Sequence, residues 1–103
     1  MNNPEDLKLV TLASSTLTRS GAKQAAALRD TTGRTYVAVN VTSPSLNLDC
    51  LEAVLTVALA SGISGVESVV ACGDKPSNLQ VIKDFAPTAT IFYIAADGSE
   101  YSL

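Results

Sequence analysis

The triplet Cys50-Leu51-Glu52 opens an apolar segment and holds two side chains that do chemistry in enzymes. A cysteine in the first turn of a helix has a lowered thiol pKa and can act as a metal ligand or a redox thiol. A carboxylate two residues further on can shuttle protons. Both side chains also have a structural interpretation. With Asp49 as N-cap, Glu52 completes an acidic capping box, and Cys50 packs as a small hydrophobic residue.

The rest of the chain offers few further metal ligands. It has no histidine and only two cysteines, Cys50 and Cys72. A catalytic zinc ion takes three protein ligands and keeps a fourth position for water. Cys50, Cys72 and Asp74 could in principle supply three donors, but the Cys72-Gly73-Asp74 spacing matches no standard ligand pattern. We therefore expect no bound metal, and no disulfide between the two cysteines.

Composition excludes several classes of protein. The 103 residues are enough for one domain, residues 1–103, and 47% of them are hydrophobic against 17% charged, which predicts a well-buried core. The net charge is −3 and the seven basic residues are scattered, so the sequence carries no nucleic-acid signal. No leader and no membrane-spanning run is found, so we expect a soluble, cytoplasmic protein with reduced thiols.

Residues that typically begin or end helices and strands predict three helices and five strands. Asn3 as a cap before Pro4 starts the first helix and Gly21 ends it. The other expected elements are strands at 24–29 and 34–41, a helix at 50–60, a strand at 66–71, a helix at 79–85, and strands at 90–94 and 100–103. The last two helices are expected to connect neighbouring strands, which gives a mixed sheet with helices on its faces. The alanine-rich strand at 24–29 predicts close packing of another element.

In order and spacing, several strings from Ser20 to the C-terminus resemble the cytidine deaminases that act on free nucleosides. The resemblance implies a three-layer α/β/α sandwich with a mixed sheet of about five strands, assembled as a homo-oligomeric dimer or tetramer. It places Cys50 at the first zinc-ligand position, Glu52 at the proton-shuttle position and Asn40 at a ribose-binding position. The strings are Ser20-Gly21, Ala26-Ala27, Asp30 to Tyr36, Val39-Asn40-Val41, Cys50-Leu51-Glu52, Gln80 to Pro87 and Ala96-Asp97-Gly98.

The chain departs from the family pattern at the positions that would complete the metal site. Lys75 and Asn78 stand where the family has its zinc-binding cysteine pair, and neither replaces a thiolate. Ala22 stands where the family has a phenylalanine whose ring packs on the base. Thr42 stands where the family has a glutamate that binds the ribose. Asn40 either holds a ribose or satisfies loop backbone groups. Lys75 is either solvated or pairs with Glu52 at the empty metal position.

We therefore expect a cytidine deaminase-like pseudoenzyme whose zinc site is degenerate. It would be retained as a binding or structural homo-oligomer, with a nucleoside-like ligand or another protein as partner. In this interpretation Glu52 and Cys50 are vestigial and no cofactor is bound. The alternative is an active zinc-dependent deaminase of cytidine or a related nucleoside, with a rearranged set of metal ligands. A weaker third option is a scaffold in RNA-related machinery.

Overall fold

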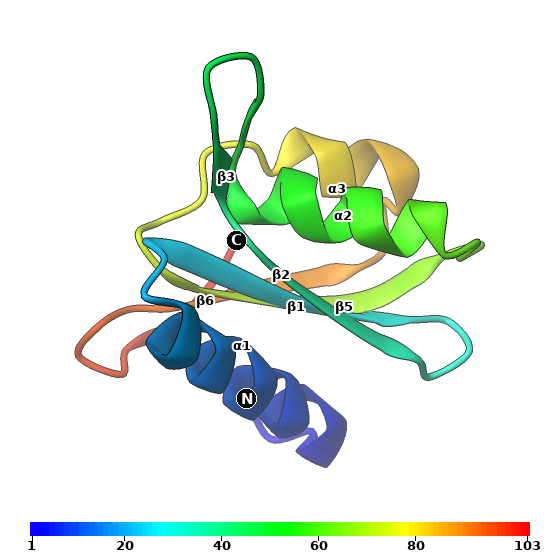
Figure 1. Ribbon diagram of the computed structural model, residues 1–103. Helices are drawn as coiled ribbons and strands as arrows, with labels where there is room; N and C mark the ends of the chain where they lie inside the picture. Colours follow the sequence, from blue (N-terminus) through cyan, green and yellow to red (C-terminus); the bar gives the residue numbers. More distant parts are fainter.

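The computed structural model describes residues 1–103 and contains a five-stranded sheet between two layers of helices (Figure 1). None of its helices is both long and apolar enough to cross a membrane. The elements, in chain order, are α1 (Pro4–Ser20), β1 (Gln24–Asp30), β2 (Thr35–Val39), β3 (Val41–Thr42), β4 (Asn47–Leu48), α2 (Cys50–Ala60), β5 (Val66–Gly73), α3 (Gln80–Phe85), β6 (Thr90–Ile94) and β7 (Glu100–Ser102).

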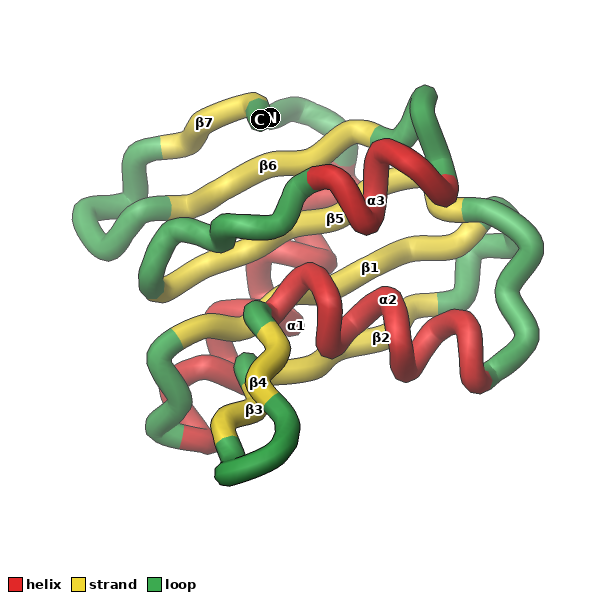
Figure 2. Tube along the Cα trace, turned by 90° about the horizontal axis from the view of Figure 1, so that it is seen from above, coloured by secondary structure: helices red, strands yellow, loops and turns green.

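The sheet has the strand order β2-β1-β5-β6-β7. Only β5 and β6 are parallel, and every other neighbouring pair is antiparallel. Helices α2 and α3 lie side by side on one face, and α1 covers the other (Figures 1 and 2). The predicted three-layer α/β/α sandwich with a mixed five-stranded sheet is thus confirmed. The sequence predicted that the last two helices both connect neighbouring strands, and for α2 this is wrong. Helix α2 leads from β2 across β1 to β5, and only α3 joins neighbouring strands.

Strand β1 is buried along its whole length because helices lie on both of its faces. Ala25 and Ala27 pack with Leu9 and Ala13 of α1. Ala26 and Leu28 face the other way, into the larger cluster formed with α2 and α3. Small side chains let the helices approach the sheet closely on both sides. The close packing predicted for this alanine-rich strand is therefore confirmed.

Two features of the loops position the site. Strand β5 extends to Gly73, two residues beyond the predicted end, because it pairs with β1 along its full length. Gly73 has a φ of 89°, and a Cβ there would overlap the carbonyl oxygen of Lys23, so glycine is required where β5 ends. The predicted loop between the hairpin and α2 contains a small β3–β4 ladder, closed by a hydrogen bond from Ser43 N to Leu46 O at 2.8 Å.

Candidate functional site

The first turn of α2 is held by a capping box. The Asp49 Oδ1 atom accepts hydrogen bonds from the backbone N–H groups of Leu51 (2.9 Å) and Glu52 (3.0 Å). In return, Glu52 Oε1 accepts from the backbone N–H of Asp49 at 2.8 Å. Unpaired N–H groups at a helix start need such acceptors, and a carboxylate there is stabilised by the helix dipole. The structural role predicted for Glu52 is thus present in the fold.

The same aspartate also binds the loop between β5 and α3. Asp49 Oδ2 accepts from the backbone N–H of Asn78 (2.7 Å) and from the backbone N–H (2.9 Å) and hydroxyl (3.2 Å) of Ser77. The Asn78 side chain donates to Glu52 Oε2 at 2.9 Å. We call Asp49, Glu52, Ser77 and Asn78 the Asp49 cluster. It joins two segments nearly thirty residues apart in the sequence at the point where the resemblance implies a metal.

The charge of Asp49 is stabilised by these contacts. Burial by itself would raise the pKa of this carboxyl, but hydrogen bonds from Glu52, Asn78 and Ser77 outweigh burial and lower the pKa below its ordinary value. Asp49 is therefore ionised at neutral pH. An ionised carboxylate that accepts several backbone hydrogen bonds makes a strong link between α2 and the loop.

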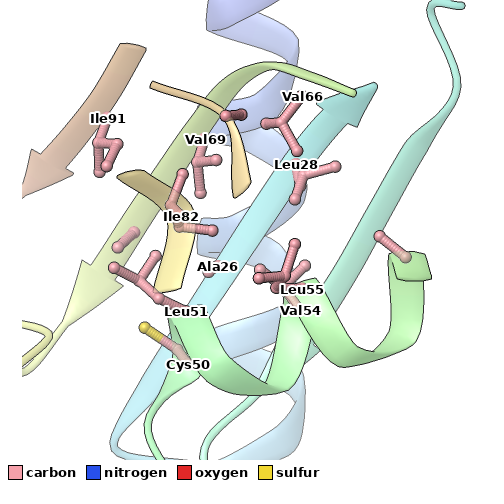
Figure 3. Packing of buried hydrophobic residues seen from close by; sticks show 13 residues of the cluster. Ala26, Leu28, Cys50, Leu51, Val54, Leu55, Val66, Val69, Ile82 and Ile91 are labelled. Carbon is pink, nitrogen blue, oxygen red and sulfur yellow. The ribbon is translucent and has the colours of Figure 1, made fainter. Parts of the chain in front are cut away.

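Cys50 does not present its sulfur to the site. The residue is 0% exposed and packs beside Leu51 in the large hydrophobic cluster (Figure 3). Its backbone N–H donates to Gln24 Oε1 at 3.0 Å. Burial, with smaller contributions from the charges of Asp49 and Cys72, raises the pKa of the Cys50 thiol to about 12. The helix position alone would lower the thiol pKa, but burial outweighs the helix dipole, and the structural interpretation, in which Cys50 packs as a small hydrophobic residue, is confirmed.

Cys72 is separated from Cys50 by the sheet itself. It belongs to the cluster under α1, whereas Cys50 belongs to the cluster under α2 and α3. Both cysteines are free, and burial raises the pKa of the Cys72 thiol. No group of three or more His, Cys, Asp or Glu side chains lies close enough together to hold a metal ion. The residues present at the head of α2 therefore do not fit the zinc ion that the resemblance implies.

A small polar pocket opens beside the capping box. Its volume is about 240 Å³, and Leu48 is its only apolar lining residue. Asn40 lies in this pocket, where its Oδ1 accepts from the backbone N–H of Gln24 at 3.0 Å. The side chain of Asn40 thus satisfies a backbone group of β1. The full lining is Lys23, Gln24, Asn40, Asn47, Leu48, Asp49, Glu52, Asp74 and Ser77.

Lys75 does not pair with Glu52. It is exposed and lines a different cavity, together with Tyr93 and Tyr101 of the strands β6 and β7. Asn78 is the residue that contacts Glu52, so one of the two interpretations left open for Lys75 was wrong. The loop turns Asp74 toward the polar pocket and Lys75 toward the other cavity.

Gln24 was missed by the sequence analysis. Its amide nitrogen donates to the carbonyl oxygens of Asp74 and Lys75, each at 3.3 Å, while its amide oxygen receives the Cys50 N–H. One buried side chain thereby holds the end of β1, the head of α2 and the loop after β5 together. A glutamine at the start of an alanine-rich strand gives no local signal of this role, because its partners are 26 to 51 residues away.

Comparison with known proteins identifies the family. A family model described as cytidine deaminase-like matches residues 2–98. Among solved structures, the cytidine deaminase from Mycobacterium leprae has a TM-score of 0.72, covers 98% of this chain and 94% of its own, and is 18% identical. At that identity the likeness concerns the fold alone. No curated protein matches the sequence. Because the family match spans almost the whole chain, this protein belongs to the cytidine deaminase-like family.

Proposed function

We propose that this chain is a non-catalytic member of the family, retained as a binding or structural protein that assembles with copies of itself. The observation that carries this proposal is the hydrogen bonding of the Glu52 carboxylate. Both of its carboxylate oxygens accept hydrogen bonds that hold the fold, one from the backbone of Asp49 and one from the side chain of Asn78.

Deamination of a cytosine ring needs an activated water and a carboxylate that is free to accept and release protons. Both carboxylate oxygens of Glu52 are already engaged in hydrogen bonds within the fold. The Cys50 sulfur lies inside an apolar cluster, and no second thiol shares its side of the sheet. Neither of the two residues in the Cys-x-Glu triplet is therefore placed for chemistry, which supports a vestigial role for both.

The polar pocket also gives little support to nucleoside binding within one copy of the chain. Its volume of about 240 Å³ lies below the roughly 300–1,000 Å³ that is typical of small-molecule sites. It lacks an aromatic wall on which a base could stack, since Leu48 is its only apolar lining residue. A structural or protein-binding role is therefore favoured over a nucleoside-binding role for Asn40.

The surface of α2 supports self-assembly. No charged residue occurs from Ala53 to Val66. Val57 is 43% exposed and Leu59 is 45% exposed on the outside of this helix. A helix that is apolar all round is normally buried. We infer that the outer surface of α2 contacts a second copy of the chain, where its small residues allow close approach.

Metal content and activity test the loss of catalysis. Protein purified without chelator should contain far less than one zinc ion per chain and should not convert cytidine or deoxycytidine to the uridine product. The Glu52→Ala variant should be less stable than the unaltered protein, because it loses the capping box. One zinc per chain, with deamination abolished by Glu52→Ala, would refute the proposal.

Oligomeric state tests the assembly surface separately. Light scattering after size exclusion should find a dimer or tetramer for the unaltered protein and a monomer for Val57→Glu. Leu7→Glu is the matched control, because Leu7 is 49% exposed on α1 at the opposite face of the sheet. This control should keep the oligomeric state. A monomeric unaltered protein, or an equal effect of both variants, would exclude α2 as the interface.

A further inference from the structure

Strand β2 is one edge of the sheet, and no other strand lies beyond it (Figure 2). Its first residue, Thr35, is exposed and the other four are half-buried, whereas the neighbouring strand β1 is buried along its whole length. Because α1 and α2 both contact each of these two strands, the difference comes from the open side of β2. A strand edge of this kind presents backbone N–H and C=O groups to its surroundings.

The hydrogen bonds at the two ends of β2 show which of its residues point outward. Asp30 N donates to Arg34 O at 2.9 Å, and Asn40 N donates to Gln24 O at 3.3 Å. In an antiparallel pair, hydrogen-bonded positions alternate with positions whose N–H and C=O groups point away from the partner strand. The even-numbered residues from 34 to 40 therefore bond to β1. The residues that direct their N–H and C=O groups to the open side are Thr35, Val37 and Val39.

This edge lacks the features that usually prevent strand edges from pairing. Natural edges are protected by charged residues, prolines, bulges or short length. No charged residue occurs from Thr35 to Leu48, and β2 itself contains neither a proline nor a shift of register. The opposite edge does have such protection, because β7 has only three residues and one of them is Glu100. The unprotected edge of the sheet is therefore β2.

We propose that β2 pairs antiparallel with β2 of a second copy of the chain, which joins the two sheets into one. This inference rests on the proposed self-assembly and gives it a backbone contact. The outward residues are symmetric about Val37, so a twofold axis at this residue places Val37 opposite Val37 of the partner subunit. Thr35 then lies opposite Val39 of the partner subunit. Each such pair exchanges two hydrogen bonds, about six in all, and no like charges are brought together.

The same arrangement places the two α2 helices on one face of the joined sheet. A twofold axis perpendicular to the sheet leaves each face on its own side, so both copies of α2 cover the same face. Helix α2 runs across β2 in Figure 2 and contacts it, so it lies close to the junction. Its exposed residues Val57 and Leu59 belong to the surface that we infer contacts a second copy. One interface thus covers both the open edge of β2 and the apolar surface of α2.

Hydrogen exchange of single amides, measured by NMR, tests the strand pairing. In the oligomer, the outward amides of Val37 and Val39 should be protected as strongly as those of Tyr36 and Ala38, which bond to β1 within the chain. Without pairing, protection alternates along β2, and the outward amides exchange about tenfold or more faster. An alternating pattern in a protein that is oligomeric would overturn the strand pairing and leave the proposed self-assembly standing. A monomer at every concentration would overturn both.

A proline variant at each edge provides a matched comparison. Thr35→Pro removes an outward N–H at the first residue of β2, where proline is tolerated and no hydrogen bond within the chain is lost. It should raise the dissociation constant of the oligomer by about tenfold or more, while slow exchange at Ala38 shows that β2 still folds. Ser102→Pro removes an outward N–H of β7, since the next residue, Leu103, donates its N–H to β6. This variant should leave the oligomer unchanged.

Two outcomes of this comparison would overturn the proposal. An unchanged dissociation constant for Thr35→Pro would show that the edge of β2 is not in the interface. Equal weakening by Thr35→Pro and Ser102→Pro would show that β2 pairs with β7 of the next copy, which is a head-to-tail contact and not a twofold one.

Discussion

Asp49 accepts a backbone hydrogen bond from Asn78 at 2.7 Å, across 29 residues of sequence, while the other oxygen of the same carboxylate caps α2. The Asp49 side chain thus has two structural roles at the N-terminus of α2. It satisfies the first turn of α2, and it fixes the loop from which both Asp74 and Lys75 project.

Removing this carboxylate should cost more than removing an ordinary helix cap. Asn3 caps α1 by accepting a single hydrogen bond from the Glu5 N–H at 2.8 Å, so Asn3→Ala should lower the free energy of unfolding by about 1 kcal/mol. Asp49→Ala loses a comparable cap and also the bonds to Ser77 and Asn78, so we expect about 2–3 kcal/mol. Urea unfolding of both variants measures the difference. Equal losses would show that the loop contacts contribute nothing.

The lowered pKa of Asp49 predicts how stability depends on pH. A carboxylate whose pKa is lower in the folded state than in the unfolded state, about 3.9 for aspartate, stabilises the fold above that value. The contribution is lost as the pH falls through the folded pKa. The unaltered protein should therefore exceed Asp49→Asn in stability at pH 7, and the gap should close below about pH 4. Parallel stability curves for the two proteins would contradict this expectation.

The Cys50 thiol should be inert in the folded protein. With a pKa of about 12, only about one thiol in ten thousand is ionised at pH 8, and the sulfur is also inaccessible. Iodoacetamide at pH 8 should label Cys50 very slowly in buffer and quickly in urea, as measured by mass spectrometry. Ser61→Cys, at the exposed end of α2, supplies an accessible thiol in the same helix for comparison. Native labelling of Cys50 as fast as that of the added thiol would refute the burial of the sulfur.

The two acidic partners of Arg29 should differ in their effect on stability. Arg29 Nη2 lies 2.9 Å from both Asp6 Oδ1, on the buried side of α1, and Glu67 Oε1, which is on the surface. Asp6→Ala takes away the buried partner of a buried guanidinium, and we expect a loss of about 3 kcal/mol. Glu67→Ala should cost less than about 1 kcal/mol, because water can replace an exposed carboxylate. Thermal or urea unfolding checks the ranking, which equal losses would contradict.

The parts of the fold that depend on local chemistry were predictable from the sequence. Asn3 before Pro4, and Asp49 with Glu52 three residues later, are complete helix-start signals, and both helices begin where these signals place them. The turn before Arg34 and the β-branched run after it likewise predicted the first hairpin. Such features need only neighbours in sequence, so one chain is enough to find them.

The site itself depended on contacts that no local pattern encodes. The hydrogen bonds that Asn78 donates to Glu52 and that the Cys50 N–H donates to Gln24 each span 26 residues, so neither was foreseen. Which of the two interpretations of Cys50 holds also depends on contacts distant in the sequence. Its position in the helix favours a reactive thiolate, but the layers above and below it decide its burial, and burial decides its pKa.

The placement of the two cysteines on opposite sides of the central sheet gives the molecule a built-in pair of conformational probes. Cys72 is 4% exposed and lines a small cavity beside α1, whereas Cys50 is 0% exposed beneath α2. Pulsed alkylation in mild denaturant would therefore report the opening of the α2 layer through Cys50, with Cys72 as an internal comparison on the other face of the sheet and no label added to the chain.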